Sequence, residues 1–139
     1  MNYRLSCAVE RPSNKEGYVL ECDGREVASD VSKCVSSNLK VCLFDALRKG
    51  LLAARVQVKH DDILYIEVQN YHVYEWLTCL KEYNTYADEL DKVFSALESV
   101  DCRYKVVFLK NPYGRTYIKN HDYTRVAVKS LESVMEEFK

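Results

Sequence analysis

The dipeptide Asp23-Gly24 separates two β-prone runs near the start of the chain, and it constrains the fold more than any other short feature. The flanking runs are residues 17–22 and 25–31. A two-residue connection of this kind forms a type I′ turn, because Asp and Gly both tolerate the positive φ angles that the turn requires. A third β-prone run, residues 3–9, precedes them. The sequence therefore predicts three opening strands, two of them in a tight hairpin.

Helical and strand-like periodicity alternate through the rest of the chain. Ser36-Ser37-Asn38 supplies N-cap side chains before apolar residues spaced three and four apart, which predicts an amphipathic helix. The later elements are a buried strand at 63–68, helices at 71–80 and 87–99, a strand at 104–109 and a helix at about 123–138. The expected order is βββαβααβα, which indicates the α/β class.

The composition bounds the class of protein. A chain of 139 residues with 47% apolar residues has enough core for one domain, and we expect residues 1–139 to form it. A net charge of −1 excludes a uniformly basic, phosphate-seeking surface. No run approaches the roughly 20 apolar residues of a membrane span, and no secretory signal is evident. We therefore expect a cytoplasmic protein that does not bind membranes.

The motif inventory offers little chemistry. Six cysteines have wide, irregular spacing without a CxxC or CxxH pair, which favours reduced thiols and argues against a structural zinc site. There is no GxxxxGK[ST] or GxGxxG loop, and none of the three histidines stands in a protease signature. From the motifs we expect no cofactor, no metal and no nucleophilic catalytic residue.

Several stretches, in the right order along the chain, resemble the ribonuclease H-like superfamily. Residues 66–73, Ile-Glu-Val-Gln-Asn-Tyr-His-Val, are similar to that family's fourth strand running into a helix. Residues 46–51, Ala-Leu-Arg-Lys-Gly-Leu, are similar to its first helix, and residues 108–114 to its fifth strand and the loop after it. Asn120 occupies the place of an asparagine before the last helix. The resemblance implies a mixed five-stranded sheet with helices on both faces.

The same resemblance implies four carboxylates that hold two divalent ions, and no alignment register gives this chain more than one of the four. Two metal ions close together need several negative charges to offset their repulsion. The first acid would fall at Leu5-Ser6-Cys7, and the second at Leu39, Val41 or Leu43. A degenerate former active site would then comprise Gln69, Asn70, Asp122 and Thr124. We expect a pseudoenzyme with no catalytic residues, which binds rather than cuts.

Three other acidic residues could form a different metal site. Asp45 lies on the first predicted helix, Glu67 on the fourth strand and Asp122 close to the last helix. Together they would make the chain a divergent metal-dependent nuclease. The plainer interpretation is that each is a surface or strand-edge carboxylate.

A basic and aromatic stretch at residues 110–125 is the main candidate for binding. Arginine and lysine neutralise phosphates, and tyrosine rings stack on unpaired bases. Residues 81–101, where many bacterial members of the resembled family carry a basic segment, are acidic here, so a long RNA·DNA hybrid is a poor ligand. Single-stranded nucleic acid is the expected partner. The candidate binding residues are Lys110, Tyr113, Arg115, Tyr117, Lys119 and Arg125.

The alternative function is protein–protein interaction, as an accessory or inhibitor protein. Tyrosine is enriched at interfaces because it buries a large area and keeps a polar tip. A chain of this size would also suit a bacteriophage or mobile-element protein. The tyrosines in question lie around the two middle helices: Tyr71, Tyr74, Tyr83 and Tyr86.

Overall fold

A computed structural model describes residues 1–10, 14–68, 70–78 and 85–108 of the chain. The predicted last helix at 123–138 and the basic stretch at 110–125 lie outside these residues. Helices on the second face of the sheet therefore stay a prediction. Among the described helices, none is long and apolar enough to cross a membrane.

The Asp23-Gly24 turn joins strands β2 (Lys15–Cys22) and β3 (Arg25–Lys33), as the sequence predicts. Asp23 has a φ of 50° and Gly24 a φ of 85°, the positive values that a type I′ turn needs. Strand β1 (Asn2–Glu10) pairs antiparallel with β2, and β2 pairs antiparallel with β3. The three opening strands form an antiparallel meander.

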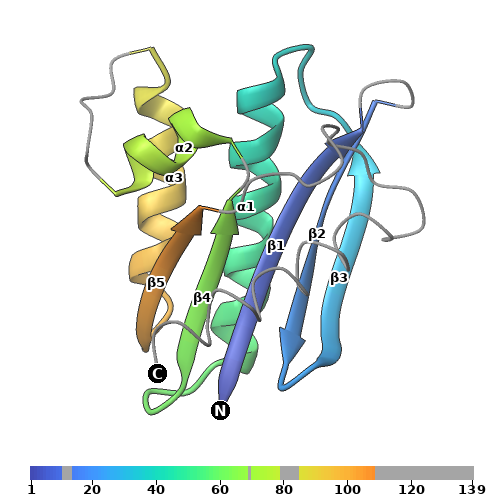
Figure 1. Cartoon of the computed structure of the whole chain (residues 1–139). Helices are drawn as coiled ribbons and strands as arrows, with labels where there is room; N and C mark the ends of the chain where they lie inside the picture. Colours follow the sequence, from blue (N-terminus) through green and yellow to red (C-terminus); the bar gives the residue numbers. More distant parts are fainter. Residues whose placement is uncertain (11–13, 69, 79–84, 109–139) are drawn as a thin grey trace.

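Two further strands extend the sheet on the other side of β1. Strand β4 (Ile63–Val68) pairs parallel with β1, and β5 (Arg103–Phe108) pairs parallel with β4. The strand order is β3-β2-β1-β4-β5, which Figure 1 shows as one twisted layer. The five-stranded mixed sheet expected from the sequence is confirmed.

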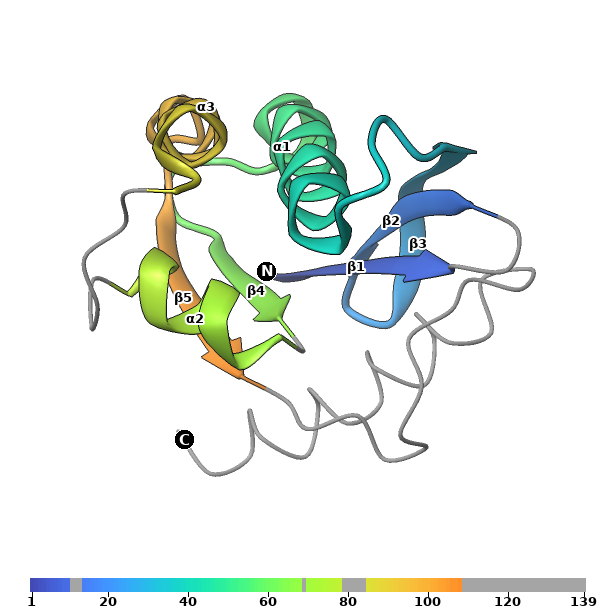
Figure 2. The same cartoon turned by 90° about the horizontal axis from the view of Figure 1, so that it is seen from above.

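Helices α1 (Leu39–Gln57) and α3 (Ala87–Glu98) lie side by side on one face of the sheet, as Figure 2 shows from above. Helix α1 begins where the sequence predicts, because the Asn38 side chain accepts hydrogen bonds from the backbone N–H groups of Lys40 and Val41. Asn38 also donates from Nδ2 to the Tyr86 hydroxyl at 3.0 Å, which links the starts of the two helices.

The short helix α2 (Tyr71–Leu77) ends three residues before the predicted end at residue 80. The hydroxyl of Thr78 donates to the carbonyl oxygen of Tyr74 at 2.7 Å, and the Thr78 backbone has left the helical region with ψ near 3°. Hydrogen bonds of this kind slightly destabilise a helix, and the apolar periodicity of the sequence does not reveal them.

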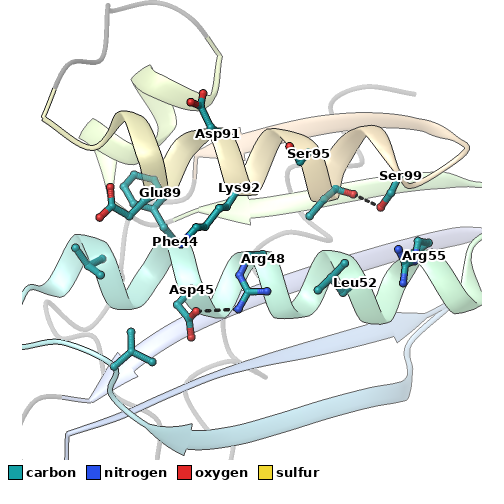
Figure 3. Close-up of a pocket in the computed structure, with 13 residues that line it drawn as sticks. Phe44, Asp45, Arg48, Leu52, Arg55, Glu89, Asp91, Lys92, Ser95 and Ser99 are labelled. Atoms are coloured by element: carbon teal, nitrogen blue, oxygen red, sulfur yellow. Dashed lines mark hydrogen bonds and ion pairs between the residues drawn. The ribbon is translucent and has the colours of Figure 1, made fainter.

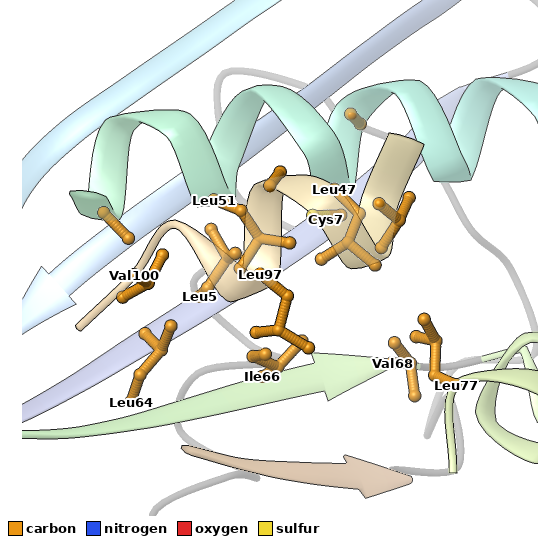
Figure 4. Close-up of a cluster of buried hydrophobic side chains, with 14 of the residues drawn as sticks. Leu5, Cys7, Leu47, Leu51, Leu64, Ile66, Val68, Leu77, Leu97 and Val100 are labelled. Carbon is orange, nitrogen blue, oxygen red and sulfur yellow. The ribbon is translucent and has the colours of Figure 1, made fainter. Parts of the chain in front are cut away.

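The core lies between the sheet and the two long helices (Figure 4). Alternate residues of β1 and β4 point toward α1, because successive side chains of a strand face opposite sides. Gly50 lets α1 approach β1 closely: a Cβ atom there would lie 2.6 Å from Cδ1 of the fully buried Leu5. The labelled core residues include Leu5, Leu47, Leu51, Leu64, Ile66, Leu97 and Val100.

Candidate functional site

A small pocket lies where β1 and β4 approach their carboxyl ends and α1 passes over them. Its volume is about 60 Å³, room for only a few water molecules. In open α/β sheets, ligands bind outside the carboxyl ends of parallel strands, so this edge is where a site is expected. The lining residues are Cys7, Leu39, Leu43, Leu47, Glu67, Val68, Asn70 and Val73.

One wall of the pocket is an apolar stripe along α1. Leu39, Leu43 and Leu47 follow each other at four-residue spacing, so they lie on one face of the helix. Val41 instead lines a different groove, between α1 and α3. Of the three positions that the resemblance left open for a glutamate, Leu39 and Leu43 face the pocket and Val41 does not.

Strand β1 contributes a thiol to this pocket. Leu5 is fully buried in the core cluster, and Cys7, two residues on, lines the pocket. Ser6 is also fully buried and pairs in register with Glu67 of β4. Burial raises the pKa of the Cys7 thiol well above its usual value, and the negative charges of Glu67 and Glu16 raise it further. Cys7 is therefore a neutral thiol and a poor nucleophile at neutral pH.

Glu67 is the one acidic residue among the described residues that line the pocket, and its side chain alternates with the core residues Ile66 and Val68, so it points to the sheet face opposite α1. Its side chain is completely buried. Hard divalent cations are held by several oxygen ligands, and a pair of them needs several carboxylates. The described lining, with one carboxylate against four aliphatic side chains of the leucine and valine type on α1 and β4, does not fit two divalent ions.

Asn70 has a structural task at the start of α2. Its Oδ1 atom accepts a hydrogen bond from the backbone N–H of Val73 at 3.1 Å, so Asn70 is the N-cap of the helix. It is the one member of the degenerate-site set that the structure describes. Gln69, Asp122 and Thr124 lie outside the described residues.

We expect Asn70→Ala to lower the free energy of unfolding by about 1 kcal/mol, because the N–H of Val73 loses its partner. Asn70→Asp keeps an oxygen at the same place and should cost less. Urea denaturation of both variants beside the wild type measures the difference. Equal losses in the two variants would contradict the capping role.

Asp45 does not join Glu67 in a second site. It lines the groove of about 820 Å³ between α1 and α3, whereas Glu67 lines the small pocket. Asp45 pairs with Arg48 at 3.1 Å, shown in Figure 3, and with Lys49 at 2.9 Å. Burial raises the pKa of Asp45, but hydrogen bonds with Glu16, Lys49 and Arg48 outweigh it and hold the pKa below its usual value. The two described members of the set Asp45, Glu67 and Asp122 thus line different cavities, and Asp122 lies outside the described residues.

The basic residues of α1 are largely engaged in contacts. Arg48 and Lys49 pair with Asp45, and Lys40 Nζ lies 5.7 Å from the ring centroid of Trp76. The groove beside them has mixed charge, because Arg48 and Arg55 on α1 and Glu89, Asp91 and Lys92 on α3 are among its lining residues (Figure 3). Such a groove is a poor match for a phosphate backbone, which requires a locally positive surface.

The tyrosines considered for a protein interface fall into two separate places. Tyr71 is 52% exposed, and its ring lies near those of Tyr74 and Phe108, with centroid distances of 6.1 and 5.2 Å. Tyr86 instead packs against Phe44 and Trp76, at 5.8 and 5.4 Å. Tyr83 lies outside the described residues. Of the three described tyrosines, Tyr71 and Tyr74 therefore lie together beside Phe108, whereas Tyr86 belongs to the junction between helices.

A buried carboxylate on β2 was not singled out by the sequence. Glu16 is fully buried, and its Oε1 atom accepts a hydrogen bond from the backbone N–H of Val35 at 3.1 Å. Burial and the nearby Asp45 carboxyl raise the pKa of Glu16 to about 7. Glu16 lies just before the strand run predicted at 17–22, and no local signal marks it as an interior residue.

The candidate nucleic-acid-binding residues all lie outside the described residues, so the structure does not test them. They are Lys110, Tyr113, Arg115, Tyr117, Lys119 and Arg125.

The fold, compared with known proteins, is similar to solved ribonuclease H structures. RNase H1 from the halophilic archaeon Halobacterium salinarum NRC-1 matches with a TM-score of 0.62 and 19% sequence identity, over 81% of this chain and 86% of that chain. The N-terminal RNase H domain of rv2228c from Mycobacterium tuberculosis, solved as a fusion with maltose binding protein, matches with a TM-score of 0.63 and 13% identity, over 94% and 98%. LC11-RNase H1 in complex with an RNA/DNA hybrid matches with a TM-score of 0.56 and 9% identity, over 77% and 84%.

No protein-family model matches the chain, and no curated protein matches its sequence significantly. The structural likeness is therefore a likeness of fold, and the fold is ribonuclease H-like.

Proposed function

We propose that the chain is a ribonuclease H-like module that binds nucleic acid without cleaving it. The proposed absence of cleavage rests on one observation, the apolar lining of the pocket at the carboxyl ends of β1 and β4. Leu39 and Leu43 stand where the resembled family would place a glutamate, and Cys7 and Ser6 stand near the place of its first aspartate. Glu67 alone cannot offset the charge of two divalent ions.

Nucleic acid is proposed as the ligand on the basis of a solved structure with the same fold and of the charge on the surface of this chain. One solved structure with this fold, LC11-RNase H1, is in complex with an RNA/DNA hybrid. In this chain the exposed side chains of α3 include Asp88, Asp91 and Glu98, and acidic groups repel a duplex backbone. Single-stranded RNA or DNA, bound through the basic and aromatic residues at 110–125, is therefore the favoured ligand class.

We expect labelled single strands to bind at low salt and to dissociate steeply as salt is added. If Lys110, Arg115, Lys119 and Arg125 each neutralise one phosphate, raising the salt from about 50 to 200 mM should weaken binding about 50-fold, because each contact contributes a slope of about −0.7. Fluorescence anisotropy of labelled oligonucleotides measures this.

The matched variants are Arg115→Ala and Lys15→Ala, which each remove one positive charge. Lys15 is an exposed residue at the start of β2. Arg115→Ala should weaken binding several-fold and reduce the salt slope by about 0.7, whereas Lys15→Ala should change neither by much. No binding at low salt, or equal losses in the two variants, would refute the proposed nucleic-acid surface.

A protein partner is the second candidate, favoured by the exposed ring of Tyr71 next to Tyr74 and Phe108. Such a partner would bind with weak salt dependence, since aromatic contacts bury area rather than charge. Tyr71→Ala would then reduce binding to the partner and leave the binding of single strands unchanged.

A further inference from the structure

Three potential metal ligands from different parts of the chain meet on the side of α1 that faces β2 and β3. They are Glu16 on β2, Cys34 directly after β3 and Cys42 in the second turn of α1. One ligand atom from each lies within 4.8 Å of the other two. Such a spacing is close to that of ligands around a single metal ion and needs only small side-chain movements to close.

The backbone holds these three residues in place. The Cys34 N–H donates to the carbonyl oxygen of Asn14 at 2.7 Å, and the Cys42 N–H donates to that of Asn38 at 3.2 Å. Glu16 is oriented by the hydrogen bond from the Val35 N–H to Oε1. Glu16 and Cys42 are fully buried, and Cys34 is half-buried. Metal ligands are typically oriented in this way by surrounding hydrogen bonds.

The buried environment of the second carboxylate oxygen of Glu16, Oε2, distinguishes this residue from an ordinary surface acid. Oε2 is buried, no N–H group of the described residues donates to it, and the Glu16 carboxyl is hydrogen-bonded to the carboxyl of Asp45. Lys49 Nζ lies 4.0 Å from Oε2. Two carboxyl groups in hydrogen-bond contact must share a proton, and a metal ion bound by Glu16 would take the place of that proton.

The donor atoms select the class of metal. Two sulfur atoms and one carboxylate oxygen suit Zn²⁺, which is bound by Cys sulfur and Asp or Glu oxygen in four-coordinate sites. Mg²⁺ and Ca²⁺ prefer sets of oxygen atoms and are disfavoured by two thiolates. Three protein ligands leave a fourth position for water or for the neighbouring Asp45.

We propose that Glu16, Cys34 and Cys42 together bind one Zn²⁺ ion, which ties β2 and the loop after β3 to the beginning of α1. Binding displaces the two thiol protons and the proton shared between Glu16 and Asp45, which are released to solvent, and it replaces the hydrogen bond that Cys42 Sγ makes to the Ser36 carbonyl oxygen at 3.1 Å. The site is separate from the pocket at Glu67, so it does not depend on the proposed nucleic-acid function.

Titration of the metal-free full chain with Co²⁺ under reducing conditions tests this site directly. Zn²⁺ has no visible spectrum, whereas tetrahedral Co²⁺ with thiolate ligands gives sulfur-to-metal charge-transfer and visible bands. We expect these bands to saturate at one equivalent of Co²⁺ and to disappear when Zn²⁺ is added. Zn²⁺ should also raise the melting temperature, because it binds the folded chain.

Cys34→Ser and Glu16→Gln should each weaken Zn²⁺ binding by at least about tenfold, and Cys34→Ser should also reduce the charge-transfer intensity. Cys22→Ser and Cys102→Ser are the matched controls, because both thiols lie outside the cluster. Cys42→Ala tests the buried ligand while keeping an apolar side chain, and circular dichroism verifies that each variant is folded.

The proposal fails if the wild-type chain gives no thiolate–Co²⁺ band. It also fails if folded Cys34→Ser and Cys42→Ala retain the wild-type spectrum and affinity, or if the control variants lose the metal to the same extent. Because the reductant prevents a disulfide between Cys34 and Cys42, loss of metal through oxidation is excluded from the result.

Discussion

Replacing Phe44 with alanine is expected to lower the free energy of unfolding by about 3–5 kcal/mol. Phe44 is 1% exposed and lies where α1 meets both other described helices. Its ring centroid is 6.3 Å from that of Trp76 on α2 and 5.8 Å from that of Tyr86 at the start of α3. The substitution removes the buried ring, leaves a cavity and breaks both aromatic contacts. A loss of this size is a large fraction of the stability of an ordinary domain.

Two matched variants make this measurement specific. Phe44→Leu keeps most of the apolar volume and should cost less than about 1.5 kcal/mol. Tyr104→Ala removes an aromatic ring that is 51% exposed on β5 and should cost less than about 1 kcal/mol. Urea denaturation followed by circular dichroism compares the three. A Phe44→Ala loss no larger than that of Tyr104→Ala would show that the helix junction does not pack as described.

Local chemistry explains which parts of the fold were predictable. The hairpin follows from Asp23-Gly24, whose residues adopt positive φ irrespective of the rest of the chain. The start of α1 follows from Asn38, because an N-cap acts through bonds within one turn. The strand at Ile63–Val68 was predicted with its observed bounds, since its apolar run suits a central parallel strand.

Features that depend on distant contacts were not predictable in the same way. The sequence alone left Leu39, Val41 and Leu43 open as the position of the resembled family's glutamate, and the rotation of α1 against β1 places Leu39 and Leu43, but not Val41, at the pocket. Glu16 lies just outside the strand run predicted at 17–22, yet it is a fully buried residue of β2 beside Lys49 of α1. Its approach to two cysteines far along the chain requires the folded sheet, so motif spacing could not reveal it.

The second large expected effect is the absence of metal-dependent cleavage by this chain. We expect it because of the residues that line the pocket at Glu67. Enzymes of ordinary proficiency accelerate reactions by at least about 10⁶-fold, so an intact two-metal site and a defective one differ by far more than the error of an assay. Metal ions act in such sites by activating water and by stabilising the attacking and leaving oxygens, which requires both ions to be held. The lining of Leu39, Leu43 and Leu47 supplies no charge for this purpose.

A cleavage assay with a labelled RNA·DNA hybrid and with single strands, in Mg²⁺ and in Mn²⁺, tests the central claim most directly. We predict no cleavage above the background of a protein-free sample, while the same preparation binds single strands. A ribonuclease H of known activity serves as the positive control for the substrate. Hybrid cleavage by the wild-type chain that is abolished by Glu67→Gln or by Asp122→Asn would contradict the claim and show that a working metal site exists.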